Sequence, residues 1–102
     1  MNNQPTGLTR ALTVAYNAVM ALGFTHQRLV DEKHGVNYNT LRRIRDGKPG
    51  KLVTDRYFLQ LFVSILEENY KKCRENADTQ GKNAILRTMR KILVFELEIP
   101  TD

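Results

Sequence analysis

Hydrophobic residues recur every three or four positions along most of the chain, which is the spacing of one face of an α-helix. In the first segment this pattern follows Pro5 and stops at Gly23, and either Thr6 or Thr9 can serve as the N-cap. We therefore expect a first helix in which one face is buried, and this face consists of Leu8, Leu12, Ala15, Tyr16, Val19 and Leu22.

A short second helix is predicted over residues 25–34. Thr25 belongs to the residue types that favour the N-cap position, and Gly35 is typical of a helix end. Within this segment Leu29 and Val30 are the apolar residues that would point inward. The pattern then restarts almost immediately, which indicates a tight turn.

A third helix is predicted over residues 38–46. Asn37 can cap it, and Gly47 lies directly after it. Leu41 and Ile44 are three positions apart and share the inward face. The remaining side chains of this helix are polar or basic, so its other faces are expected to meet solvent or a ligand.

A longer fourth helix follows, for which Thr54 is the predicted N-cap. Its polar second half, residues 67–76, must project from the core or reach a partner. A loop is expected over residues 76–81. The predicted inward face of the helix comprises Phe58, Leu61, Phe62, Ile65, Leu66 and Cys73.

The last helix is expected to end at Pro100. Residues 94–99 alternate apolar and acidic side chains, so an extended strand is the alternative there, but they also continue the helical period, which favours helix. The predicted inward face comprises Ile85, Leu86, Met89, Ile92, Leu93 and Leu97.

Together these patterns predict an all-α fold in one domain, with an extended fourth helix and a C-terminal helix. A length of 102 residues suits one hydrophobic core. We expect a flexible N-terminus over residues 1–7, a core over residues 8–66 and a C-terminal helical extension over residues 67–102.

Several classes of protein are disfavoured by the sequence. Its longest apolar runs are too short to span a bilayer, and its polar first residues lack the pattern of a secretory signal. A lone cysteine, Cys73, fits a reducing cytoplasm, and His26 and His34 are eight positions apart without ligands between them. No nucleophile and base, metal motif or phosphate loop is evident, so we expect no enzyme, no metal and no cofactor.

Basic charge is concentrated in the middle of the chain. The net charge of the whole chain is +5, and residues 23–56 carry +4 of it, with eight basic and four acidic side chains. Such a patch suits a polyanion, although a solvated charged face is the ordinary alternative.

The two short helices, their tight turn and the basic charge coincide in one segment. A helix-turn-helix needs such a turn and a second helix that can enter the major groove of DNA. Residues 23–47 resemble the helix-turn-helix of the phage-repressor and Cro family, also called the XRE family. The residues that carry the resemblance are Thr25, Gln27, Leu29, Gly35, Val36, Leu41, Ile44, Gly47 and Lys48.

This resemblance implies a lambda-repressor-like domain of five helices that binds double-stranded DNA and regulates transcription. It implies that the start of the third helix reads base edges, and the residues there have suitable chemistry. The implied base-contacting residues are Tyr38, Asn39, Thr40, Arg42 and Arg43, with Arg42 reading a base or touching phosphate. The implied phosphate-contacting residues are His26, Gln27, Lys48, Lys51 and Arg56.

A homodimer is the form in which such a domain usually gains selectivity, because two half-sites are then read together. Phe95, Leu97 and Ile99 are candidate contacts in the C-terminal helix, and the alternative is that they cover the core.

Three positions depart from the family's pattern: Val30, His34 and Arg45. They keep open a second function, in which the chain is a helical protein-interaction module, such as an antitoxin-like protein or an adaptor, with weak or lost DNA binding.

Overall fold

The computed structural model describes residues 7–97, and every regular element in that range is a helix. The helices are α1 (Gly7–Ala21), α2 (His26–Glu32), α3 (Tyr38–Arg45), α4 (Leu52–Glu75) and α5 (Thr79–Leu97). The expectation of an all-α fold is therefore confirmed. No helix within residues 7–97 is long and apolar enough to cross a membrane.

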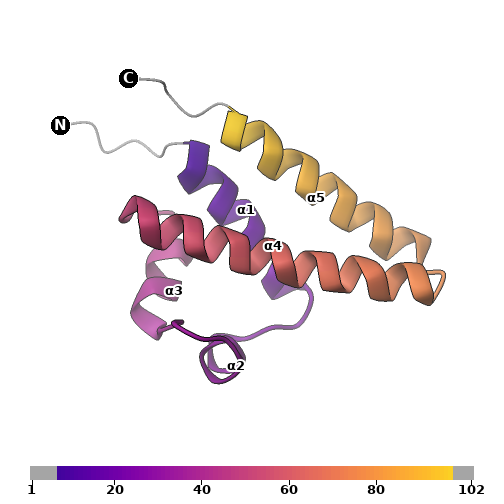
Figure 1. Cartoon of the computed structure of the whole chain (residues 1–102), viewed down its shortest axis with the longest axis horizontal. Helices are drawn as coiled ribbons and strands as arrows, with labels where there is room; N and C mark the ends of the chain where they lie inside the picture. The colour runs from indigo at the N-terminus through magenta and orange to yellow at the C-terminus, as the bar shows by residue number, and fades with distance from the viewer. Residues whose placement is uncertain (1–6, 98–102) are drawn as a thin grey trace.

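Helices α1, α4 and α5 form the body of the molecule, and α2 and α3 lie on one side of it (Figure 1). Helices α4 and α5 meet at a tight loop and spread apart along their length, while α1 packs against both. In the view of Figure 1, α3 and α5 lie on opposite sides of α4.

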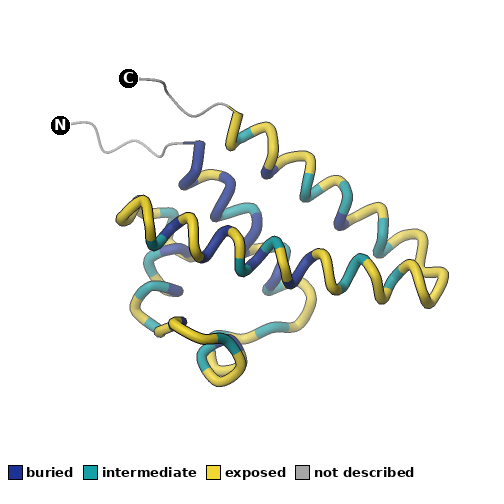
Figure 2. Tube along the Cα trace, in the orientation of Figure 1, coloured by how far each residue is buried: buried dark blue, intermediate teal, exposed yellow. Residues whose placement is uncertain are grey.

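One continuous hydrophobic cluster holds these helices together, and buried positions recur along the inward side of each helix (Figure 2). At its centre Phe62 of α4 meets Tyr16 and Phe58 edge to face, with ring centroids 6.2 and 6.1 Å apart. Ile85 and Ile92 of α5 belong to the same cluster, at 5% and 3% exposure. Helix α5 is therefore part of the core, whereas the sequence pattern predicted a core over residues 8–66 and a helical extension after it.

The first helix differs from expectation at both ends. Thr9 lies inside α1 and is buried, so it is not the N-cap, and Thr6 lies outside the described residues. Leu22 follows the helix and is 37% exposed, because the chain already turns toward Gly23 there. The other five predicted inward residues are buried, namely Leu8, Leu12, Ala15, Tyr16 and Val19.

Helix α4 begins earlier than predicted. Lys51 occupies its N-cap position and Thr54 lies within its first turn. No side chain caps this end, but the Asp55 carboxylate lies in the first turn, where the helix dipole favours a negative charge. The Lys51 carbonyl accepts the first helical hydrogen bond from the Asp55 amide at 2.9 Å.

Helix α5 also begins earlier than predicted, at Thr79, so the loop before it is shorter than residues 76–81. The reason is local: Asp78 Oδ1 accepts a hydrogen bond from the Gly81 amide at 3.0 Å, as an N-cap does. Helix continues to Leu97, which confirms the helical alternative over the described part of residues 94–99. Pro100 and Ile99 lie outside the described residues.

Candidate nucleic-acid interface

Helices α2 and α3 are joined by a tight turn and share a small apolar contact. Leu29 of α2 and Leu41 and Ile44 of α3 are almost completely buried, and Val36 between the helices is 8% exposed. Val30 is half-buried and packs against the same core, so its larger side chain is accommodated. This contact fixes the orientation of α3 relative to α2.

Side chains cap the start of both helices, as the sequence predicted. Thr25 Oγ1 accepts a hydrogen bond from the Arg28 amide at 3.1 Å. Asn37 Oδ1 accepts one from the Thr40 amide at 2.9 Å. Each cap satisfies a backbone donor that the helix itself cannot use. The first turn of α3 is therefore held in place at its end.

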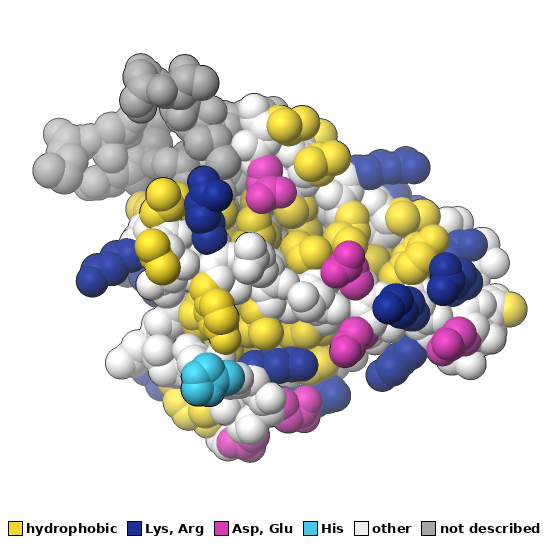
Figure 3. All heavy atoms as spheres, viewed as in Figure 1, with side chains coloured by type: hydrophobic (Ala, Val, Ile, Leu, Met, Phe, Trp, Pro, Cys, Tyr) yellow, Lys and Arg dark blue, Asp and Glu magenta, His cyan; other side chains and the backbone are white. Residues whose placement is uncertain are grey.

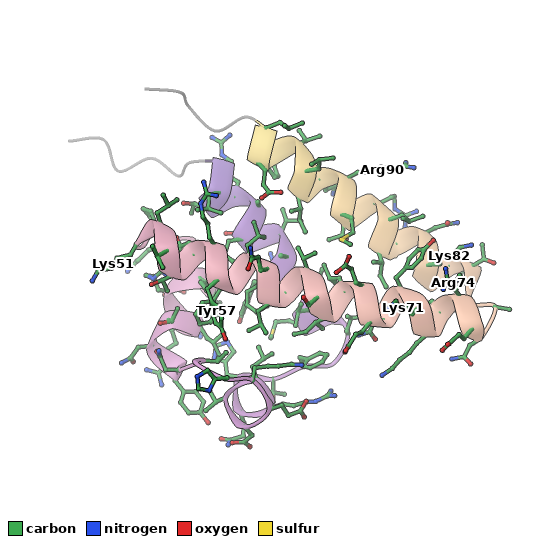
Figure 4. All side chains as sticks on the ribbon, in the orientation of Figure 1. Lys51, Tyr57, Lys71, Arg74, Lys82 and Arg90 are labelled. Atoms are coloured by element: carbon green, nitrogen blue, oxygen red, sulfur yellow. The ribbon has the colours of Figure 1, made fainter. Side chains whose placement is uncertain are left out.

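The turn between α2 and α3 is covered by a residue of α4 that the sequence analysis did not single out. Gly35 adopts φ +77°, a conformation that L side chains rarely take. The Tyr57 hydroxyl donates a hydrogen bond to the His34 carbonyl, and Figure 4 shows Tyr57 on the side of α4 toward α2 and α3. Because its partner is 23 residues away, no local pattern marks Tyr57 for this contact.

Arg43 of α3 lies in a bonded cluster that we call the Arg43 clasp, formed with Lys48, Gly50 and Asp55. Its Nη2 lies 2.5 Å from Asp55 Oδ1, and its Nη1 donates to the Lys48 carbonyl at 2.8 Å. The Gly50 amide donates to Asp55 Oδ2 at 3.1 Å, and Asp55 is only 2% exposed.

The clasp changes the role expected for Arg43. Its guanidinium, which the sequence analysis assigned to a base edge, is occupied by an internal carboxylate and carbonyl. The cause is the buried Asp55, which needs a cationic or hydrogen-bonding partner in the interior. We therefore assign Arg43 to positioning the loop between α3 and α4, and not to reading a base.

The outward side of α3 presents polar and basic side chains. Asn39 and Arg42 are exposed, and Arg42 Nη1 donates to Asn39 Oδ1 at 3.3 Å. Thr40 and Tyr38 are half-buried. The Tyr38 hydroxyl donates to Gln27 Oε1, which links the two helices at their exposed edge. Four of the five expected base-contacting residues therefore retain at least partial exposure without an internal ion pair.

Two of the expected phosphate-contacting residues flank α3. Lys48 and Lys51 are exposed on the loop between α3 and α4, and Figure 4 shows Lys51 projecting from the start of α4. Arg56 is placed differently, because it lines a hollow between α4 and α5 together with Glu96. The structure thus does not bring Arg56 together with the other residues of the expected set.

His26 is held by a residue of α1. Its Nε2 and the Tyr16 hydroxyl are 2.7 Å apart, and the rings meet edge to face at 5.8 Å. Burial lowers the pKa of His26, and the positive charges of Arg45 and Arg42 lower it further. Burial raises the pKa of Tyr16. His26 is thus half-buried, and its neutral form is favoured by burial and by the two nearby cations of α3.

Arg45 is the residue at this face that the sequence analysis left out of the expected set. It is exposed, and its Nε lies 3.1 Å from Asp46 Oδ1. Its charge acts on both Tyr16 and His26, so it lies close to the start of α2. Its signals in the sequence were its place in the basic segment and its departure from the family's pattern.

The chemistry of this face is that of amide, hydroxyl and guanidinium groups. Within residues 7–97, no group of three or more His, Cys, Asp or Glu side chains is arranged to hold a metal ion. Such donors suit hydrogen bonding to base edges and phosphate oxygens.

Comparisons with protein-family models, with curated proteins and with solved structures found no match to this chain.

Proposed function

We propose that the protein binds double-stranded DNA in a sequence-dependent manner through α3. The observation that carries the proposal is the two-sided character of this helix. Leu41 and Ile44 are buried against the core, while Asn39 and Arg42 are exposed on the other side. A short helix that is fixed on one side and bears amide and guanidinium groups on the other is suited to the major groove.

Each exposed side chain of α3 has a distinct part in the proposed recognition. The Asn39 amide can bond to adenine through two hydrogen bonds, and the Arg42 guanidinium can do the same with guanine or contact a phosphate. Thr40 can donate a hydrogen bond or touch a thymine methyl group, and the Tyr38 ring can touch such a methyl group while its hydroxyl donates to Gln27. A good bidentate pair contributes about 1–3 kcal/mol of discrimination against the wrong base.

Phosphate contacts in this proposal come from the side chains that flank α3. Lys48 and Lys51 supply charge from the loop after the helix, and Arg45 adds a cation beside His26. Gln27 is exposed, but its amide nitrogen donates to both carboxylate oxygens of Asp31 at 2.9 Å, so it must leave Asp31 before it can donate to a phosphate oxygen. These contacts orient the protein and make binding depend on salt.

The biological role that we propose is transcriptional regulation in the cytoplasm by occupancy of a DNA site. The proposal needs no catalysis, metal or cofactor. Because one helix-turn-helix buries little DNA surface, we propose that two copies bind together.

A titration of labelled random-sequence duplex, followed by fluorescence anisotropy at several salt concentrations, tests the proposal. Affinity should fall steeply as salt rises, and Arg42→Ala and Lys48→Ala should each weaken binding and reduce the salt slope. Arg87→Ala is the matched control, because Arg87 is exposed on α5. Absence of binding at every salt concentration by a folded protein would sink the proposal.

In vitro selection of bound duplexes separates base readers from phosphate contacts. Asn39→Ala should relax the preference at one position of the selected site, whereas Lys48→Ala should weaken binding to all sequences alike. A palindromic site would indicate two copies on the DNA.

A second function, a protein-interaction module, is favoured by the exposed apolar side chains of α5. Leu93, Val94 and Leu97 are 56%, 52% and 79% exposed. Failure to bind DNA, together with capture of a protein partner that Leu93→Asp abolishes, would favour this function over the first.

A further inference from the structure

A trough runs between α4 and α5 on the face of the molecule that Figure 3 shows. It consists of two hollows of about 440 and 370 Å³. Glu67 lines both, so the two hollows adjoin at this residue and follow one another along α4. The first lies where α4 and α5 spread apart, and the second lies nearer their connecting loop.

Apolar side chains line the trough and continue onto α5. Leu59 and Val63 of α4 line the first hollow, and Leu86 and Met89 of α5 line the second. Leu93 follows Leu86 by two helical turns, so it lies on the same side of α5. Its 56% exposure leaves an apolar side chain beside the trough that residues 7–97 do not cover, and we call this position the ridge at Leu93.

Charges of both signs are distributed unevenly along the trough. Glu96 and Arg56 line the first hollow, whereas Lys71 and Arg74 line the second. Figure 3 shows acidic and basic side chains around the apolar band, with several basic ones gathered toward the end where α4 and α5 meet, and Figure 4 shows Lys71 and Arg74 near the loop end of α4. None of the ion pairs found within residues 7–97 involves these groups or Glu67.

We propose that a second copy of this chain docks in the trough, related to the first by a two-fold axis. A two-fold axis across the trough reverses its direction, so the first hollow of one copy faces the second hollow of the other. Glu96 of each copy then meets Lys71 and Arg74 of the other, and the ridge at Leu93 enters the partner's apolar lining. With Glu67 counted in both, the first hollow carries two acidic side chains and one basic, and the second carries one acidic and two basic. Reversed docking therefore brings opposite net charges together, and Arg56 is the one cation of the first hollow that faces the basic end of the partner.

The size of this face suits such an interface. The protein measures 48 × 30 × 18 Å along its principal axes, and the trough lies on its broad face. A stable interface typically buries about 800 Å² on each partner, which is well within the area of that face.

The proposed dimer also bears on DNA binding, and its biological purpose rests on that proposed function. Helices α3 and α5 lie on opposite sides of α4. A two-fold axis that runs across the trough from the α5 side to the α3 side keeps both α3 helices on one edge of the dimer. Two half-sites on one side of a duplex could then be contacted together.

Sedimentation equilibrium of the full chain without DNA tests the interface by a charge exchange. We expect a concentration-dependent dimer, in which Glu96→Arg alone and Arg74→Glu alone each raise the dissociation constant about tenfold or more. The double variant should return it toward the original value, because the pair is restored with reversed signs. Leu93→Asp should abolish the dimer, and Arg87→Glu on another side of α5 should leave it unchanged.

Two results would overturn the inference. One is a chain that sediments as a monomer at all concentrations, and the other is a dimer that neither the single charge reversals nor Leu93→Asp weakens. Circular dichroism of each variant separates loss of the dimer from loss of the fold. Because no DNA is present, failure of the dimer and failure of DNA binding are read out independently.

Discussion

Two neighbouring arginines of α3 differ in what their guanidinium groups contact. Arg42 is exposed and donates one hydrogen bond to Asn39, so the rest of its guanidinium is open to a ligand. Arg43 is bound to the buried Asp55 carboxylate at 2.5 Å. The two side chains are chemically identical, and the difference arises because successive residues of a helix point about 100° apart. The direction of each arginine side chain therefore decides whether it is open to a ligand or bound to Asp55.

His26 makes the stability of the protein depend on pH. Burial and the nearby Arg45 and Arg42 lower the pKa of His26 below its ordinary value of 6.5 in the folded state. As pH falls below about 6.5, His26 becomes protonated in the unfolded chain while it is still neutral in the folded protein. The free energy of unfolding therefore decreases. Above that pH both states are neutral at this site and the effect vanishes. Urea denaturation at a series of pH values between about 5 and 8 measures it.

The control for this prediction is His26→Gln, which removes the titrating group. In this variant the free energy of unfolding should decrease less as pH falls. His34→Gln, at an exposed position, should leave the decrease as it is. A stability that rises as pH falls from 7 to 5.5 in the original protein, and not in His26→Gln, would contradict the assigned cause.

At the scale of elements, the Arg43 clasp fixes the connection between α3 and α4. A Cβ added at Gly50 would lie 2.2 Å from Arg43 Cζ, so Gly50→Ala must displace the guanidinium from Asp55. Arg43→Ala removes the partner of Asp55 directly. Arg43→Ala should lower the free energy of unfolding by about 2–4 kcal/mol, because it leaves a buried carboxylate without its cation. Gly50→Ala should lower it by less, because the Arg43 guanidinium is the end of a flexible side chain and can shift. Chemical denaturation of the purified variants gives the values.

A double-mutant cycle checks that one cause underlies both losses. In the Arg43→Ala background, Gly50→Ala should cost less than about 1 kcal/mol, since no guanidinium remains to be displaced. Full additivity of the two losses would show that Gly50 acts in some other way.

Helix starts were predictable where a side chain marks them. Thr25 and Asn37 each bond to an amide three residues later, and that spacing is visible in the sequence. Thr54 failed as a predicted cap, because α4 begins at Leu52 without any side-chain cap and the first turn is instead held through Asp55. The ion pair between Asp55 and Arg43 joins residues twelve positions apart, so no local pattern in the sequence marks it.

At the scale of the whole molecule, α5 is part of one cooperative core. Ile92 is 3% exposed in the cluster that α1 and α4 share. We predict that Ile92→Ala lowers the free energy of unfolding by about 2–5 kcal/mol, with a single transition retained. Val94→Ala, at a 52% exposed position of the same helix, should change it by less than about 0.5 kcal/mol. Thermal or urea denaturation distinguishes the two, and a negligible effect of Ile92→Ala would mean that α5 is only an appendage.

The burial of the candidate dimer residues was not determined by the helical period. Phe95 is half-buried and packs against the core, whereas Leu97 is 79% exposed, and Ile99 lies outside the described residues. The helical period placed Leu97, and not Phe95, on the inward face, and the structure reverses this assignment. Only the position of α1 against α5 separates the residue that covers the core from the one that remains accessible.

The sequence by itself determined the five helices, the inward residues of α1 to α3 other than Leu22, and the concentration of basic charge around α3. These features depend on spacing along the chain and on local capping, which a sequence displays directly. Tertiary structure alone decided that Arg43 is bound to Asp55, that Tyr57 covers the turn, and that a trough remains between α4 and α5. Each of these depends on groups far apart in sequence, and their approach is fixed only when the helices pack.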